Sequence, residues 1–522
     1  MTALLPAAFL ALALVAPGGG APPAAPRPAT TVAPAAAPPA APTAPAAPAA
    51  PAAPAPPAAP PATDAPAATT AAPPAVAPSP EARLLGDDAG RAVPGPARRY
   101  QVERVRVDGL SHVREAEVRR RLLVADGEVL DEEKVLLSRL RLLQLGWFSR
   151  VETRVERGSE RGLVVLVFQV AERNTILITD LVLAATEAQP LYGGFGLSQQ
   201  NFLGRGLGLS GAFVYGGTPS DRPQDPERFA VRASFFAPDV EFPGFRHGLV
   251  LGGMVLFLHG EELVCGDPDC DAYPDVGTAP VIRYDRLAGE VTVGGRPGPF
   301  ERIHATYRYE RLDASRAGSP PPTEDAGPPI LLGESTLSAI TGTWEIDTRD
   351  DFFLPREGFR AIAQVTFGSK LLGSDYEYSR YRLELDTSFG LFGRPLKLQA
   401  VLGAAQGSPP FFERFYAADY SYFAVGPALA RALELNFSTD ARYDQFVSGV
   451  GLEYAVPLWA SSGFFRRGYL ALGARGIYST ETLGGSRTTF SRSPVSAELA
   501  VRFDTPVGVF NASVAYWLDI AL

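Results

Sequence analysis

In the stretch RIHATYRYE, residues 302–310, apolar and polar side chains alternate without a break, and this pattern is the strongest indication of the fold. One face carries Ile303, Ala305, Tyr307 and Tyr309, and the other carries Arg302, His304, Thr306, Arg308 and Glu310. This period of two residues is typical of a β-strand whose two faces meet different surroundings. The stretches YRLELDTSF (381–389) and VSAELAVRFD (495–504) alternate in the same way. The sequence therefore predicts a mainly β fold in this part of the chain.

Similar segments fill the chain beyond Asn174, separated by turns rich in Gly, Pro, Asp and Ser. Fifteen strands are expected, beginning near Ile176, Leu191, Gly204, Arg228, Gly248, Val281, Arg302, Thr336, Gly358, Glu377, Pro395, Tyr443, Arg467, Val495 and Gly508. A large soluble β-sandwich or a propeller would also alternate. Three features favour a transmembrane β-barrel: an export signal, aromatic residues near the ends of the apolar faces, and connections that alternate between short and long.

The alternating connection lengths predict which end of the barrel faces the exterior. Short turns such as 201–206 and 391–395 are typical of the periplasmic end, and long loops such as 261–277 and 408–440 are typical of the external end. Bacterial single-chain barrels have an even number of strands. We therefore expect about sixteen strands, one more than the fifteen counted.

The chain before the barrel divides into three expected regions. Residues 1–20 contain a short apolar core followed by small residues, which indicates a secretory signal peptide. Residues 21–97 are dominated by Ala and Pro and are expected to form a disordered tether, because they have little apolar surface to bury. Residues 98–173 have the pattern strand, helix, helix, strand, strand, which predicts one small α+β domain ahead of the barrel at residues 174–522.

Composition and motif spacing exclude several classes of function. A net charge of −9 and a pI near 5.3 provide no overall basic field to attract nucleic acid. The four histidines lack metal-ligand spacing, and no nucleophile is flanked by a suitable base. The glycine-rich GLGLSG, residues 206–211, precedes no helix and so does not predict a nucleotide site. We expect no enzymatic activity, no cofactor and no metal.

The two cysteines, Cys265 and Cys270, lie close together, and in an exported chain they are expected to form a local disulfide. Asp267, Asp269 and Asp271 surround them and offer oxygen ligands of the kind that Ca²⁺ prefers. A solvated external loop is the favoured interpretation of these carboxylates.

Residues 98–173 resemble a POTRA domain. The resemblance is carried by the Val-Asp-Gly that ends at Gly109 and by Leu145, Gly146, Phe148 and Val151 at the junction between helix and strand.

The barrel resembles that of the BamA and TamA type of outer-membrane assembly protein. Four motifs follow the order of that family: QNFLGRG (200–206), DTRDDFFLPREGF (347–359), GVGLEYAVPL (449–458) and RFDTPVG (502–508). The resemblance implies a barrel in the bacterial outer membrane, in contact with its lipid, and one POTRA domain in the periplasm. It also implies as partners unfolded outer-membrane or secreted polypeptides, with periplasmic chaperones or accessory lipoproteins.

The stretch FFERFYAADYSYFAVGPALA, residues 411–430, falls on the sixth external loop of that family, which folds back into the lumen. The resemblance implies an aromatic lumen plug that contains Phe411, Phe412, Arg414, Phe415, Tyr416, Phe423 and Ala424. Family members have an arginine where this chain has Ala424, and that arginine meets an acidic group on the inner wall. Glu453 resembles the acidic wall residue, so Arg414 or Arg431 is the candidate replacement partner, with water as the alternative.

Three functions remain open from the sequence. In the first, an assembly factor receives substrate strands at the edge of the POTRA sheet and inserts them through the seam between the first and last barrel strands. In the second, a secretion pore exports one dedicated polypeptide. In the third, the barrel is a passive structural protein.

Overall fold

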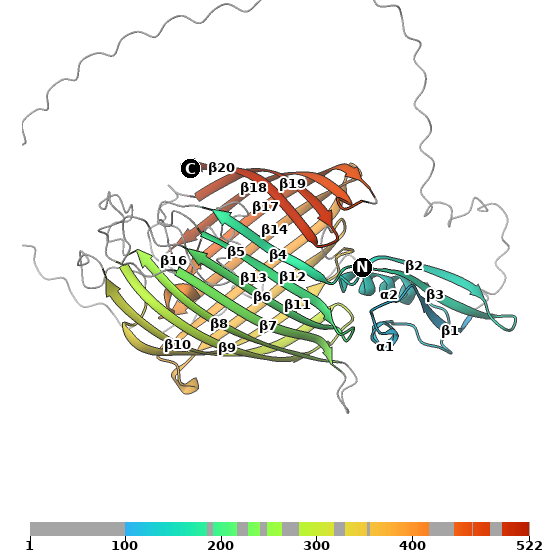
Figure 1. The fold of residues 1–522 in the computed structure, drawn as a ribbon, viewed down its shortest axis with the longest axis horizontal. Coiled ribbons are helices and arrows are strands. Elements are labelled where there is room, and N and C mark those ends of the chain that lie inside the picture. The colour runs from blue at the N-terminus through green and yellow to red at the C-terminus, as the bar shows by residue number, and fades with distance from the viewer. Residues whose placement is uncertain are drawn as a thin grey trace, which may run out of the picture. The chain divides into compact units, whose positions relative to one another are not determined.

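The computed structural model describes residues 100–184, 192–216, 228–240, 248–263, 281–317, 329–351, 355–416, 443–461, 463–480 and 493–520 (Figure 1). The expected signal peptide, tether and cysteine pair lie outside these residues. No helix in the described part of the chain is long and apolar enough to cross a membrane.

The N-terminal folded part has the expected order of strand, helix, helix, strand and strand. Its elements are β1 (Gln101–Asp108), α1 (Glu115–Arg119), α2 (Glu132–Gln144), β2 (Phe148–Arg157) and β3 (Leu163–Glu172). The sheet order is β1-β3-β2, with β1 parallel and β2 antiparallel to the central β3. Asp131 caps α2, because its carboxylate accepts the backbone N–H groups of Glu133 and Lys134. Val105, Leu142 and Phe168 are buried between the helices and the sheet.

The rest of the chain forms one antiparallel sheet in which each strand pairs with its neighbours in sequence (Figure 1). Its fifteen strands are β4 (Ile176–Ala184), β5 (Tyr192–Phe202), β6 (Leu207–Gly216), β7 (Arg228–Val240), β8 (Leu249–Leu263), β9 (Val281–Gly295), β10 (Glu301–Ala317), β11 (Gly333–Asp347), β12 (Gly358–Gly368), β13 (Tyr378–Leu391), β14 (Arg394–Gly407), β17 (Phe446–Ala460), β18 (Arg467–Thr480), β19 (Ser493–Thr505) and β20 (Gly508–Ile520). The predicted mainly β fold is confirmed, and these are the fifteen strands counted from the sequence. A sixteenth strand is not found among the described residues.

Smaller elements lie in the connections on the external side. They are the 3₁₀ helices η1 (Lys370–Leu372) and η2 (Phe411–Glu413) and the short strands β15 (Phe415–Tyr416) and β16 (Tyr443–Asp444). Because β15 pairs with β16, the two ends of the sixth loop meet in a hairpin base.

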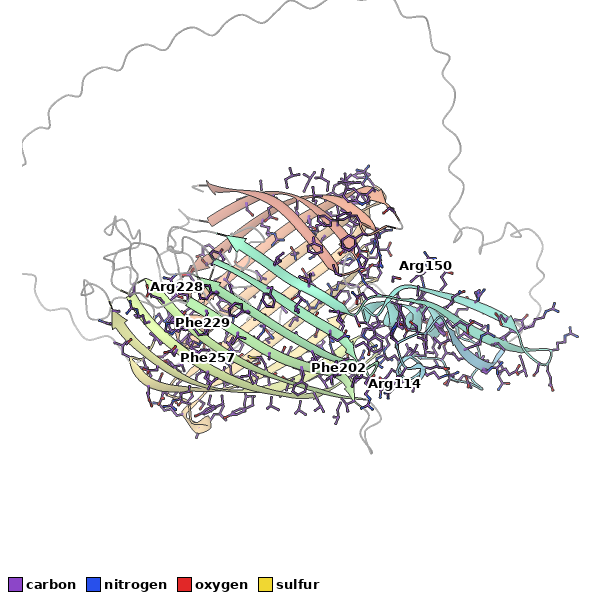
Figure 2. All side chains as sticks on the ribbon, in the orientation of Figure 1. Arg114, Arg150, Phe202, Arg228, Phe229 and Phe257 are labelled. Carbon is purple, nitrogen blue, oxygen red and sulfur yellow. The ribbon has the colours of Figure 1, made fainter. Side chains whose placement is uncertain are left out.

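The two faces of the barrel wall have the polarity of a membrane barrel. In β10, Ile303 and Tyr309 are 49% and 50% exposed, whereas Glu310 is fully buried. Phe229 of β7 and Phe257 of β8 pack against each other on neighbouring strands, with tilted rings whose centroids lie 5.5 Å apart (Figure 2). Apolar side chains therefore face outward and charged ones inward, the reverse of a soluble sheet.

Candidate functional site

The base of the sixth loop packs against the inner wall of the barrel. Phe411 and Phe412 belong to a buried cluster of wall residues from β5 to β13. The ring of Phe411 meets Tyr284 of β9 edge-on at 5.2 Å, and its backbone N–H donates to the carbonyl of Pro329 at 2.8 Å. These contacts hold the start of the loop inside the lumen.

Phe415 occupies a second position on the wall. It is 1% exposed and packs with Ala405, Val447 and Ile477. A Cβ atom at Gly403 of β14 would lie 2.5 Å from the Phe415 ring, so glycine leaves the room that this ring needs.

The other proposed plug residues are placed only in part. Arg414 is half-buried, and Tyr416 forms backbone pairs in β15. Phe423, Ala424 and Arg431 lie outside the described residues. The contribution of the loop tip to the plug thus stays a prediction.

Glu453 has a partner that the sequence did not suggest. Its two carboxylate oxygens accept Nη1 and Nη2 of Arg502 at 2.5 and 2.6 Å. Arg502 lies on β19, so two wall residues form this fork rather than a loop arginine and a wall acid. The expected pairing of Glu453 with Arg414 or Arg431 stays a prediction, and Arg502 is the partner that the described residues provide.

The predicted POTRA motif residues have clear structural roles. Gly109 has φ +96°, and a Cβ there would lie 2.1 Å from the Val170 carbonyl oxygen. Gly146, with φ +72°, follows Leu145, the C-cap residue of α2, and turns the chain into β2. Phe148 and Val151 then enter the core.

Trp147, the unassigned position of that motif, contacts the barrel. Its indole Nε1–H donates to the Gln200 carbonyl at 3.3 Å, and the guanidinium of Arg121 lies 4.6 Å from its ring centroid. A Cβ at Gly206 would lie 2.7 Å from Arg121 Nη2. Burial lowers the pKa of Arg121, and Glu117 and Asp239 counteract that effect. The QNFLGRG motif therefore supplies the surface that receives the POTRA domain.

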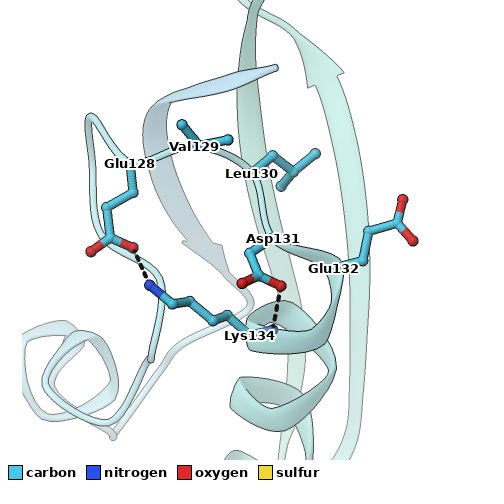
Figure 3. A pocket seen from close by; sticks show the side chains of 6 residues that line it. All are labelled: Glu128, Val129, Leu130, Asp131, Glu132 and Lys134. Carbon is cyan, nitrogen blue, oxygen red and sulfur yellow. Dashed lines mark hydrogen bonds and ion pairs between the residues drawn. The ribbon is translucent and has the colours of Figure 1, made fainter. Parts of the chain in front are cut away.

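The two edges of the POTRA sheet differ in whether they are covered. The edge of β1 is covered by the segment that follows α1. The Val102 N–H donates to the backbone carbonyl of Glu128, and the Leu130 N–H donates to that of Tyr100, both at 2.8 Å. The covering segment also lines a groove with Asp131, Glu132 and Lys134, in which Lys134 binds Glu128 at 3.2 Å (Figure 3).

No strand in the described part of the chain pairs with the outer edge of β2. At one end of this edge, the Nε–H of Arg139 in α2 donates to the Val151 carbonyl at 2.9 Å. The open part of this edge therefore runs from Glu152 to Arg157.

The first and last strands of the barrel sheet meet only at their periplasmic ends. Fifteen strands that alternate in direction leave β4 and β20 running the same way. Across the described residues no ladder joins the two strands, and one backbone bond, from Ile178 N–H to the Val507 carbonyl at 2.9 Å, links β4 to the β19–β20 turn. We call this boundary the seam.

Asp504 forms ion pairs with residues on both sides of the seam, at the periplasmic end of the barrel. This buried carboxylate, in the RFDTPVG motif, pairs with Arg173 just before β4 and with Arg467 of β18 at 3.0 Å. Arg467 also binds Asp351 at 3.3 Å. Because β17, β14 and β13 separate β18 from β12, the β11–β12 turn must reach across the mouth to make that contact.

Comparisons with known proteins agree with this architecture. Residues 201–519 match the Omp85 superfamily domain, and residues 100–173 match the POTRA repeat described as surface antigen variable number repeat. The outer membrane protein assembly factors BamA of Nitratidesulfovibrio vulgaris and Neorickettsia risticii are 26% and 19% identical over 331 and 311 residues. These matches cover 61% and 59% of this chain but only 37% of each relative.

The structure of CdiB from Escherichia coli has a similar fold. Its TM-score is 0.52 at 10% identity, and the match covers 81% of this chain and 74% of that one. The expected location is confirmed, with the barrel in the bacterial outer membrane and the POTRA domain in the periplasm. With its superfamily domain matching well over half of its length, and with its POTRA match, the chain belongs to the Omp85 superfamily.

Proposed function

We propose that this protein assembles outer-membrane proteins by adding substrate strands at the seam between β4 and β20. The seam is the observation that carries the proposal, because an unpaired strand edge is a template for another strand. The similarity to BamA assembly factors supports it, although the chain spans little more than a third of their length.

The uncovered edge of β2 supports a first step in the periplasm. An extended polypeptide that pairs there is held by main-chain hydrogen bonds, so one edge accepts many sequences. Because β1 is covered by residues 127–130, we assign this role to β2 alone.

A disulfide across the seam tests the proposal. Cysteines would replace Ile178 and Val507 in the full chain, with Cys265 and Cys270 changed to serine. In liposomes, the oxidised variant is expected to fold an unfolded barrel substrate at least about tenfold more slowly, because strands tied at their periplasmic ends cannot move apart to admit a substrate strand. Reduction should restore the rate.

A second cysteine pair controls for oxidation and for general stiffening of the wall. Residues Ala361 and Leu385 are direct partners on β12 and β13, away from the seam. A disulfide there should leave the folding rate unchanged. Undiminished substrate folding by the oxidised seam variant would contradict insertion at the seam, and continued export of a single polypeptide by that variant would favour the secretion pore.

A further inference from the structure

A buried carboxylate lies at the base of the sixth loop. Glu413 ends η2 and is 6% exposed, between Phe412 and Arg414. An ionised carboxylate inside a protein must be compensated by opposite charge or hydrogen bonds. The groups around Glu413 therefore show what holds the loop.

Two wall arginines approach Glu413 from separate strands. Arg380 Nη1 of β13 lies 3.6 Å from one carboxylate oxygen, and Arg308 Nη1 of β10 lies 4.0 Å from the other. Strands β11 and β12 lie between β10 and β13 in the sheet. One loop side chain thus joins two parts of the wall that do not pair with each other.

Arg380 and a third wall arginine, Arg286 of β9, contact the phenylalanines on either side of Glu413. Arg286 lies 3.5 Å from the ring centroid of Phe412, and Arg380 lies 4.9 Å from that of Phe415. Cations over aromatic faces are attracted to the ring quadrupole, most strongly where water is excluded. Ion pairs and cation–π contacts therefore both hold the base of the sixth loop against the wall.

The wall arginines around the loop base also pair with carboxylates of the wall itself. Glu310 binds Arg286 and Arg308, and Glu290 lies 3.5 Å from Arg308. Both Arg286 and Glu310 are fully buried. Glu413 adds a carboxylate from the loop to this buried set of wall charges.

We propose that Glu413 is the positioning residue that locks the sixth loop into the lumen, with the charges reversed from the family pattern. Here the acid is on the loop and the arginines are on the wall. The lock is at the base of the loop, so it does not require an arginine at position 424. This inference concerns where the loop is held and stands apart from the proposed assembly function.

Hydrogen exchange of residues 409–416 in the full-length, membrane-reconstituted protein tests the lock. Glu413→Gln should make these amides exchange about tenfold faster, including Phe411 N–H, because the segment opens more often. Glu413→Lys should increase exchange further. Adding Arg380→Glu to Glu413→Lys should restore protection, which a loss of packing alone would not do.

Two further variants keep the result interpretable. Glu377→Gln removes an exposed carboxylate that binds Lys370 at 3.4 Å on the external rim, and it should leave exchange unchanged. Replacing residues 417–442 by a short Gly-Ser linker should leave residues 409–416 protected. Unchanged exchange in Glu413→Gln, failure of the charge swap to restore protection, or loss of protection in the linker variant would each overturn the proposal.

Discussion

At the scale of single residues, the POTRA domain depends on one carboxylate that binds three successive backbone amides. Glu172 accepts the N–H groups of Ser111, His112 and Val113 and the Ser111 hydroxyl. Replacing Glu172 with alanine should destabilise the domain by about 1–3 kcal/mol, because the amides lose a charged acceptor. The loss is measured by unfolding the full chain in denaturant, with hydrogen exchange of the amides of residues 111–113 as the readout. Glu160→Ala, in an exposed turn, is the matched control and should have little effect.

The same carboxylate predicts how stability depends on pH. Burial opposes ionisation of Glu172, but its hydrogen bonds to Ser111, Val113 and His112 prevail and lower its pKa from 4.5 to about 2. A depressed folded-state pKa means that the unfolded chain binds more protons between these values. The contribution of Glu172 should therefore be complete above pH 4.5 and disappear as the pH falls toward 2. An unfolding free energy with the same acid dependence in Glu172→Ala as in the original protein would contradict this assignment.

Single residues also show where sequence reasoning succeeds and fails. Family motifs identified Glu453 as a wall carboxylate, but its partner Arg502 lies two strands away, and only the register across β18 brings them together. Glu413 was within the quoted loop sequence and was not singled out. Its importance depends on Arg308 and Arg380, which are distant in sequence and converge only when the barrel closes around the loop.

At the scale of elements, the two edges of the POTRA sheet should behave differently toward unfolded chains. A photo-crosslinking residue at Arg154 of β2 should capture an unfolded barrel protein, because that edge is open. The same residue at Arg104 of β1 should capture about tenfold less or none, since residues 127–130 already bond that strand. Equal capture at both positions would show that the edge is not the receptor.

Strands with strong alternation could be predicted from the sequence, but which strand edges stay unpaired could not. The alternation in residues 302–310 specifies β10 and its outward face, because each inward residue would be costly in lipid. The cover on the β1 edge comes from the irregular segment 127–130, which has no period to detect. Sequence alone therefore identified the POTRA sheet but left both edges equally available.

At the scale of the whole molecule, the barrel is joined to the periplasmic domain through its motifs. The QNFLGRG turn receives Trp147 and Arg121, and Asp504 pairs with Arg173 at the root of the first strand. The order of these motifs was visible in the sequence. Their contacts were not, because each joins residues tens to hundreds of positions apart.

We propose that this barrel assembles other barrels, and depletion of the protein in its native host would show whether it does. Quantitative proteomics of the outer membrane should show a fall of about twofold or more in many unrelated β-barrel proteins, because their strands would lose the seam that templates insertion. Lipoproteins of the same membrane should keep their levels. Loss of one exported polypeptide with all barrel proteins unchanged, or no change at all, would contradict the claim.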